Sequence, residues 1–528
     1  MDSLLTFRFC RRIETEKTMS APRLMVIELD GATWTVMKPL LDKGELPNLK
    51  KLIDRGASGV LMSDPPTISP KIWTTIFSGK APEKHGIEFF GASSKMLRSK
   101  RIWDILGERG YTVGTFGTLV TWPPHPVNGF MIPSICALGT ETFPEHYQFF
   151  QEMSLSERKK WKDTHGRILA LWESLGLGLK LMSHGTSLGT MFKGAATLMR
   201  NKLLKPGMLD RYYRMVFLHL EMATGLLRHL LRKFKPDFCT WHIHTCDSIA
   251  HRYWAFHEPG PFEGKVDPKM IESLGNVITD SYRVSDKAIG KILKGIPEST
   301  DVLVVSDHGG EAMPEAINPY SAKIDVMLDI LQLKDKVVVA RFGPGVHVKF
   351  NEKDRDLQEL TQKRLSEARV VETGDPAYFV KPFGNTLVVT KPNERANVEA
   401  IHDDCHISFG DLGEYKLTDI NVKLDMQMSG CHADEGIIIM AGPNIQKGIE
   451  LPMASVRDIT PTMLTLLGEA VGKDMDGQVI ESALEPAFLE EKGIQYIDTY
   501  EDGSYDEIED EEIDHEKLKE RLAHLGYL

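Results

Sequence analysis

Short apolar runs alternate along this chain with segments of helical periodicity. The runs are six to nine residues long, as expected for strands covered on both faces. They lie at 24–29, 58–63, 111–117, 237–245, 301–306 and 436–442. Segments with helical spacing or helix stop signals lie between or after them, at 46–52, 102–110 and 458–468. This alternation predicts an α/β fold with a mostly parallel sheet sandwiched by helices.

The stretch at 64–87, DPPTISPKIWTTIFSGKAPEKHGI, predicts a loop that leads into a helix. Ser69 is the expected N-cap, Pro70 the first helical residue, and Gly79 a left-handed C-cap. A serine there lies beside free backbone N–H groups and the positive end of a helix dipole, which favour a phosphate-like group and an alkoxide. The simpler interpretation is that Ser69 only caps the helix.

Two segments interrupt the alternation. Residues 151–235 are helical, rich in Leu and Met, and contain sixteen Lys and Arg against six Asp and Glu. Residues 316–428 have mixed character, with strand candidates in VHVKF and NTLVV. The predicted plan is an N-terminal extension (1–23), a catalytic core (24–315 and 429–490), a basic helical insertion (151–235), an α+β insertion or cap (316–428), and an acidic tail with a short C-terminal helix (498–528).

Composition narrows the class of protein. The 528 residues are 42% hydrophobic and 26% charged, which is typical of soluble globular proteins. The net charge of -12 argues against a nucleic-acid-binding module. The six cysteines form no CxxC pair, and neither a signal peptide nor a run of eighteen apolar residues is present. We therefore expect reduced thiols and a cytoplasmic location; Met19 could serve as the start, because the first strand begins only at Leu24.

Residues able to bind a metal ion follow three of the predicted strands. They are Asp30 after the first strand, Asp247 and His251 after the strand that ends at 245, and Asp307 and His308 after the strand that ends at 306. Since ligands bind at the carboxyl ends of the strands in open α/β sheets, these groups should meet at one edge. His432 precedes its strand, so that rule does not place it.

Three carboxylates, three imidazoles and Ser69 suit two divalent cations that share one site. Two cations about 4 Å apart can neutralise phosphate charge and hold the attacking and leaving oxygens of a phosphoryl transfer. Taken singly, Asp30 and Asp307 could be turn or cap residues, His251 a core histidine and His432 a loop residue. Four strand-flanking segments that each carry Asp or His are harder to assign to turns.

These segments resemble the type I phosphodiesterase and nucleotide pyrophosphatase branch of the alkaline phosphatase superfamily. The matching pieces are VIELDG, TISPKIWTTIFSGKAPEKHGI, HTCDSIAHRYW, VVSDHGG, CHADEGIIIMAGPNIQKG, DITPTMLTLLG and MDGQVI, in the family's order over residues 24–480. The resemblance implies an alkaline-phosphatase-like fold and two zinc ions, with Mn²⁺ as an alternative. It implies that one ion is bound by Asp30, Ser69, Asp307 and His308, and the other by Asp247, His251 and His432.

The resemblance also places Ser69 at the nucleophile, where many relatives have Thr. Ile72 stands where nucleotide pyrophosphatases have a phosphate-binding Asn, so the resemblance does not select a nucleotide. SPKIW does not match the sulfatase motif. The implied activity is metal-dependent cleavage of phosphodiester or pyrophosphate bonds in a small phosphorylated substrate, through a phospho-serine. Lys71 is a candidate substrate-binding residue near the nucleophile.

Three alternatives remain open at this stage. The same two-metal site could serve a phosphomonoesterase, or a phosphotransferase or phosphomutase, and a scaffold protein on a decayed enzyme fold is a further possibility. The basic segment at 151–235 is either a structural helical lobe with a solvated basic face or a cap that contacts an anionic substrate or membrane surface.

Overall fold

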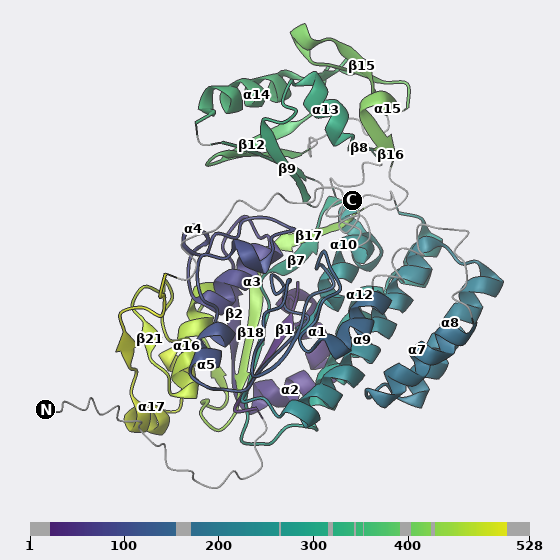
Figure 1. Cartoon of the computed structure of the whole chain (residues 1–528). Coiled ribbons are helices and arrows are strands. Elements are labelled where there is room, and N and C mark those ends of the chain that lie inside the picture. The colour runs from purple at the N-terminus through teal and green to yellow at the C-terminus, as the bar shows by residue number, and fades with distance from the viewer. Residues whose placement is uncertain are drawn as a thin grey trace, which may run out of the picture.

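The computed structural model describes residues 22–154, 171–262, 266–314, 320–342, 345–351, 353–390, 403–423 and 428–503 (Figure 1). The predicted N-terminal extension lies outside the described residues up to position 21, as does the predicted acidic tail with its helix from position 504 onward.

A central sheet runs through the larger body of the molecule, in the order β19-β2-β18-β6-β1-β5-β3-β4, with β20 beside β2. Its strands are β1 (Leu24–Leu29), β2 (Gly56–Met62), β3 (Val113–Phe116), β4 (Gly129–Ile132), β5 (Phe238–Ile243), β6 (Asp301–Val305), β18 (Glu435–Ala441), β19 (Ile449–Glu450) and β20 (Ala454–Ser455). Every pairing in this sheet is parallel except those of β18, which runs antiparallel to β6 and β2. The mostly parallel sheet expected from the sequence is confirmed.

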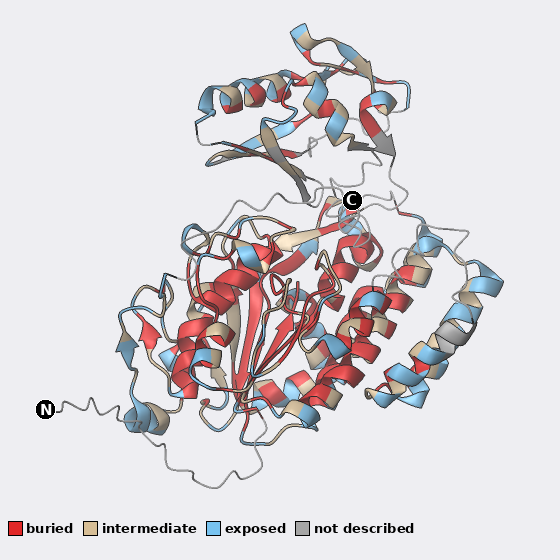
Figure 2. Ribbon diagram, in the orientation of Figure 1, coloured by how far each residue is buried: buried red, intermediate tan, exposed pale blue. Residues whose placement is uncertain are grey.

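The alternation of side chains along β1 divides the apolar residues between two cores. Met25, Ile27 and Leu29 join the cluster on one face, and Leu24 and Val26 join the other. Helices supplying the first cluster are α1 (Trp34–Asp42), α2 (Pro47–Asp54), α9 (Met208–Phe234), α10 (Thr245–His257) and α12 (Val277–Leu293). Those supplying the second are α3 (Ser69–Ser78), α5 (Ile102–Glu108) and α16 (Ile459–Leu467). The strands are therefore mostly apolar because both faces of the sheet are covered (Figure 2), with a few buried polar residues such as Glu28 and His242.

The basic helical segment begins with helical residues at 151–154 and, after the undescribed residues, continues in three helices. They are α7 (Leu171–Ser183), α8 (Leu188–Leu204) and α9; residues 155–170 lie outside the described part of the chain. In α9, Leu226, Leu227 and Leu230 are fully or almost fully buried, so the leucines of LLRHLLRKFK belong to the core. In contrast, α8 lies on the outer side of α9, and most of its large apolar side chains are exposed (Figure 2).

A second body with its own apolar core follows β7 (Gly309–Ala312) and ends before β17 (Gly430–Ala433). Its elements are β8 (Tyr320–Ala322), α13 (Ile324–Ile330), β9 (Val337–Phe342), β10 (Gly345–Phe350), α14 (Arg355–Glu367), β11 (Arg369–Val370), β12 (Phe379–Phe383), β13 (Thr386–Thr390), β14 (His406–Ser408), β15 (Glu414–Lys416), α15 (Leu417–Ile420) and β16 (Asn421–Lys423). The strands expected in VHVKF and NTLVV correspond to β10 and β13. Because β7 and β17 pair antiparallel, this α+β insertion extends from a two-stranded ribbon (Figure 1).

The remaining helices and strands are short. They are α4 (Pro82–His85), α11 (Pro268–Leu274), α17 (Pro486–Lys492), β21 (Val471–Gly472) and β22 (Tyr496–Ile497). The five cysteines in the described ranges form no disulfide. A membrane-crossing helix would have to be longer and more apolar than any helix among the described residues.

Candidate metal and phosphoryl-transfer site

The ends of β1 and β5 are held together directly below the site. The Asp30 N–H donates to the Ile243 carbonyl at 3.1 Å, and the Asp247 N–H donates to the Asp30 carbonyl at 3.1 Å. Gly31 lies between these contacts with φ +65°, and a Cβ there would be 2.8 Å from the Cβ of Asp247. A glycine is therefore required both for the backbone conformation and for the close approach of Asp247.

Asp247 and His251 project from one face of α10 because they are four residues apart. His251 Nε2 lies 3.1 Å from Asp247 Oδ1, and its Nδ1 lies 3.0 Å from the Gly430 carbonyl. His432 Nε2 lies 3.4 Å from the same Asp247 oxygen and 3.1 Å from His251 Nε2. Its Nδ1 lies 2.6 Å from the Thr67 carbonyl. The structure thus brings together the three residues that the sequence assigned to one metal ion.

His432 reaches the site although it precedes its strand. The antiparallel strand β18 begins at the edge of the sheet where the parallel strand β6 ends. The β7–β17 ribbon pairs His432 with Gly310, two residues after His308. As a result, the imidazoles of His308 and His432 stack with ring centroids 3.5 Å apart.

Ser69 is the first residue of α3, and not its N-cap as the sequence predicted. The N-cap is Ile68, whose backbone is extended and whose side chain cannot cap. Ser69 is 2% exposed, and its Oγ lies 3.2 Å from His308 Nε2. The interpretation that Ser69 only caps the helix is therefore wrong. The expected left-handed C-cap at Gly79 is confirmed, with φ +69°.

Three backbone carbonyls fix the tautomers of the three histidines. The Nδ1 atoms of His251, His308 and His432 each lie within 3.0 Å of a carbonyl, to which only a protonated Nδ1 can donate. In the neutral rings, every Nε2 is then a lone pair. These lone pairs face one another, the carboxylates and Ser69 Oγ, and two facing lone pairs 3.1 Å apart are stabilised by a proton or a metal cation between or beside them.

The buried carboxylates of the site also need positive charge beside them. Asp307 Oδ2 and Asp30 Oδ1 are buried without a hydrogen bond from the described residues. Burial, and then the like charges of Asp30 and Asp247, hold the pKa of Asp307 well above its usual range. Burial alone would also raise the pKa of Asp247, but the imidazoles of His251 and His432 hold it well below. An excess of buried negative charge around Asp307 is what divalent cations would neutralise.

Two groups of ligand atoms have the spacing that a metal ion needs. They are Asp247, His251 and His432, and Asp30, Asp247 and His308, with the atoms of each group within 4.8 Å of one another. Asp307 Oδ2 and Ser69 Oγ lie 3.3 Å and 3.2 Å from His308 Nε2, beside the second group. The residues present therefore fit divalent metal ions.

Sequence reasoning missed a buried pair behind the site. His242 Nε2 lies 3.1 Å from Asp30 Oδ2, and its Nδ1 lies 3.1 Å from Glu28 Oε2. Burial opposes protonation of His242, but the two carboxylates outweigh it and raise its pKa to about 10. A glutamate inside the apolar run LMVIEL was the signal, because a buried carboxylate needs a partner. The register of β1 and β5 then pairs Glu28 with His242.

Lys71 lies in the first turn of α3 and is 5% exposed. Burial lowers its pKa to about 8, against the opposing charges of Asp64, Glu83 and Glu88. None of these carboxylates belongs to the seven candidate ligands. The predicted role of Lys71 in substrate binding therefore stays a prediction.

Comparison with known proteins matches most of the chain to one family. Residues 24–382 match the family of type I phosphodiesterases / nucleotide pyrophosphatases. This match covers more than half of the chain, and it contains six of the seven candidate ligands. The chain belongs to the type I phosphodiesterase / nucleotide pyrophosphatase family, and it is a hydrolase of that family with two groups of residues that could hold a metal ion.

Two further comparisons were made. No curated protein sequence matches the chain. Among solved structures, human ectonucleotide pyrophosphatase / phosphodiesterase 5 is similar with a TM-score of 0.44 and 13% sequence identity, over 88% of this chain and 100% of that chain.

Proposed function

We propose that this protein hydrolyses phosphodiester or pyrophosphate bonds through a phospho-serine at Ser69, with two divalent cations, Zn²⁺ or Mn²⁺, bound by the seven ligands. The observation that carries the proposal is the convergence of three Nε2 lone pairs on the carboxylates and Ser69 Oγ. When bound, the cations would neutralise phosphate charge and lower the pKa of the Ser69 hydroxyl.

The covalent step uses groups of this chain in a defined order. Ser69 Oγ attacks phosphorus and loses its proton to water, while the bond from phosphorus to the leaving oxygen breaks and that oxygen takes a proton. Water then attacks phosphorus, the Oγ–P bond breaks, and Ser69 and a phosphate monoester are released. The first turn of α3 favours the anion, since it lies at the positive end of the helix dipole and the Lys71 N–H donates to no described group.

The side chains near Ser69 favour diesters over monoesters. A monoester brings one more negative charge, and the position three residues after Ser69 is the apolar Ile72, which is fully buried. A small pocket lies beside Pro70, and its walls include Phe90, Leu119 and Trp122. Hydrolysis of a nitrophenyl diester at least about tenfold faster than its monoester is the expected result. A preference for the monoester would favour the phosphatase or phosphomutase alternative.

Metal analysis tests the ligand set directly. The purified protein should hold about two transition-metal ions per chain, and chelation should abolish activity until Zn²⁺ or Mn²⁺ is restored. Asp307→Asn and His432→Ala should each lower metal content and turnover. Full metal content and activity in both variants would contradict the proposal, with His257→Asn, at the far end of α10, as the matched control.

A further inference from the structure

The outward face of α8 carries large apolar side chains at helical spacing. Leu188, Phe192, Met199 and Leu203 recur at intervals of four and seven residues, which places them on one stripe. They are 65%, 73%, 63% and 72% exposed, respectively. Leu204, at the end of the same helix, is 67% exposed. Scattered apolar residues are ordinary on a protein surface, but a continuous stripe of this kind marks a contact site.

The inward face of α8 has the opposite character. Thr190 is buried, and Gly194, Thr197 and Asn201 are partly buried. A Cβ on Gly194 would lie 3.5 Å from Leu218 of α9, so this small residue is close to the core helix. A surface helix normally packs its apolar side inward. Here Met191 is the bulky apolar residue of α8 that packs inward, beside small and polar residues, and the other bulky apolar residues of the helix are exposed.

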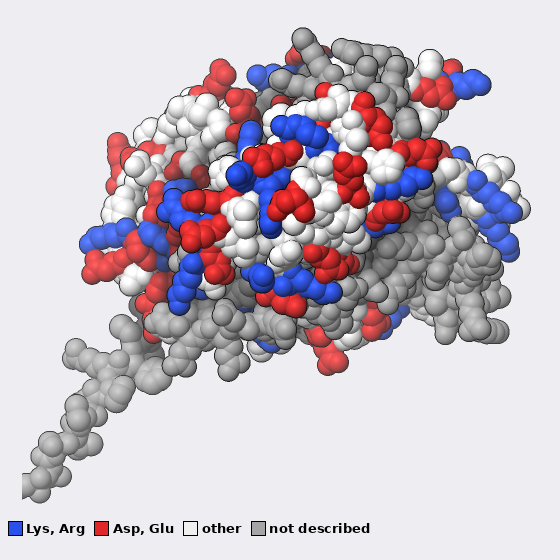
Figure 3. All heavy atoms as spheres, turned by 90° about the horizontal axis from the view of Figure 1, so that it is seen from above, with Lys and Arg blue, Asp and Glu red and all other residues white. Residues whose placement is uncertain are grey.

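The charge of this region has one sign. Residues 174–209 contain five Lys and Arg and no Asp or Glu. Lys193 and Arg200 pair with Glu221 and Asp210 of α9. Lys202 and Lys205 are exposed, form no ion pair with a described residue, and flank the exposed Leu203 and Leu204. On the face of the molecule seen from above, by contrast, acidic and basic side chains are interspersed (Figure 3).

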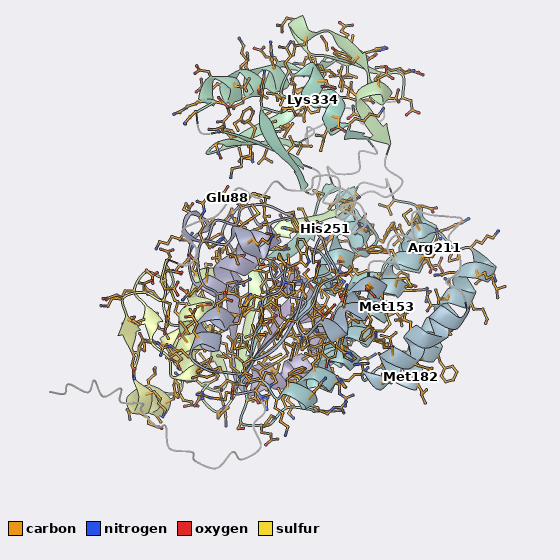
Figure 4. The ribbon with its side chains drawn as sticks, viewed as in Figure 1. Glu88, Met153, Met182, Arg211, His251 and Lys334 are labelled. Atoms are coloured by element: carbon orange, nitrogen blue, oxygen red, sulfur yellow. The ribbon has the colours of Figure 1, made fainter. Side chains whose placement is uncertain are left out.

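The C-terminal end of α8 lies at the same end of the molecule as the metal site. The turn after α8 leads into α9, where the Leu209 carbonyl accepts a hydrogen bond of 2.5 Å from Tyr253 and the Tyr212 hydroxyl accepts one of 3.0 Å from Arg252. Both donors follow the ligand His251 directly on α10. Arg211 and His251 accordingly lie at a similar height in Figure 4.

We propose that the outward face of α8, from Leu188 to Lys205, docks on an anionic lipid surface. The apolar stripe would enter the boundary between headgroups and acyl chains, and Lys202 and Lys205 would contact the headgroup phosphates. The charge favours lipid over a second copy of this chain, because two such faces would bring like charges together. The cluster LLRHLLRKFK of α9 is not part of this surface, since its leucines are buried.

Vesicle co-sedimentation of the full-length protein tests the proposal, with phosphatidylcholine vesicles that contain or lack about a third phosphatidylglycerol. Wild type should bind the anionic vesicles and release as salt rises. Lys202→Gln with Lys205→Gln should weaken binding roughly tenfold. Phe192→Gln with Leu203→Gln should weaken binding at least as much on the same vesicles. Arg228→Gln with Arg232→Gln, which removes two exposed charges of α9, is the matched control and should bind as wild type does.

The melting temperature and the molar mass in solution are also measured for the wild type and each variant, as controls for folding and for dimer formation. The variants should unfold at the wild-type temperature and hydrolyse a soluble diester at the wild-type rate, because the replaced side chains are exposed. Absence of vesicle binding by wild type at low salt, or equal binding by all variants, would overturn the proposal. So would a dimer that only Phe192→Gln with Leu203→Gln dissociates, which would assign the face to a second copy. If Phe192→Gln with Leu203→Gln lowers the melting temperature markedly and the wild type does not bind vesicles, the outward face of α8 packs within the chain.

Discussion

Single atoms on three imidazoles decide what the site can bind. Each Nδ1 donates to a backbone carbonyl, so each Nε2 is available as a ligand atom. The burial of these rings has an electrostatic consequence: desolvation, and then the neighbouring His432, lower the pKa of His308 to about 4. The candidate ligand His308 is therefore neutral at physiological pH and would have no proton to displace before a cation binds.

Ser69 is the residue whose role is most directly testable. Ser69→Ala should lower kcat by about a thousandfold or more while leaving most metal binding intact, because six ligands remain. Ser69→Thr should retain measurable activity, since the hydroxyl is kept. Phosphate trapped on Ser69 by rapid acid quench would identify the covalent intermediate. Ser78→Ala, in the same helix, is the control, and a fully active Ser69→Ala protein would exclude Ser69 as nucleophile.

His242 is a positioning residue for Asp30. His242→Asn keeps a donor near the place of Nδ1 for Glu28 but loses the contact with Asp30, and should weaken metal binding by about 10–100-fold. His242→Gln keeps a donor near the place of Nε2 and should weaken it less. Competition with a chelator of known affinity measures both. Equal affinities for the two variants and wild type would show that the contact between His242 and Asp30 does not orient the ligand.

At the scale of elements, the candidate ligands are positioned where the ends of strands and helices approach one another closely. The loop after β1 and the start of α10 touch at Gly31, and the start of α3 delivers Ser69 to the loop after β6. Asp247 and His251 need no such meeting of distant segments, because one turn of α10 aligns them. The precision of the site therefore depends on a few interelement contacts.

Gly31→Ala tests the tightest of these contacts. The new Cβ would clash with Asp247, so the variant should lose about 2 kcal/mol or more of stability and a large part of its metal. Gly44→Ala is a matched control, because Gly44 has φ +71° with open space around it. It should lose only the backbone cost of about 1 kcal/mol and keep its metal. Denaturant unfolding and metal analysis measure both effects, and equal metal content in the two variants would contradict the explanation.

At the scale of the whole molecule, one ribbon joins two bodies with separate cores. The α+β insertion leaves the core through β7 and returns through β17, and His432 lies on the returning strand. The Lys349 ammonium of β10 lies 2.6 Å from the carboxylate of Glu88, just after the stretch that carries Ser69. Because that ion pair is partly exposed, it adds little to stability.

Replacement of residues 315–427 by a short turn tests this division. The ribbon pairing from Gly309 to Ala312 should keep His432 in place, so the shortened protein should bind metal as the full chain does. Hydrolysis of a small nitrophenyl diester should persist within about tenfold. Metal analysis and circular dichroism measure the outcome. Loss of the bound metal from a folded core would show that the insertion, and not the ribbon, positions His432.

The sequence by itself determined the sheet and most of the site. Strands covered on both faces consist mainly of apolar residues, so these runs can be recognised in the sequence without a structure. The carboxyl ends of parallel strands meet at one edge, so Asp30, Asp247 and Asp307 could be grouped from their positions after strands. The helix that starts near Ser69 was also predicted from the sequence. The place of Ser69 as N-cap was wrong by one residue, because cap and first helical residue differ only in local geometry.

Only the tertiary structure decided the rest. His432 reaches the site because β18 runs antiparallel, and strand direction depends on pairing partners that local sequence does not name. The contact between Glu28 and His242 depends on the register of two strands more than two hundred residues apart. The direction of the apolar stripe on α8 was equally hidden. Periodicity shows that a helix has an apolar face, but only packing against α9 determines whether that face points into the protein or away from it.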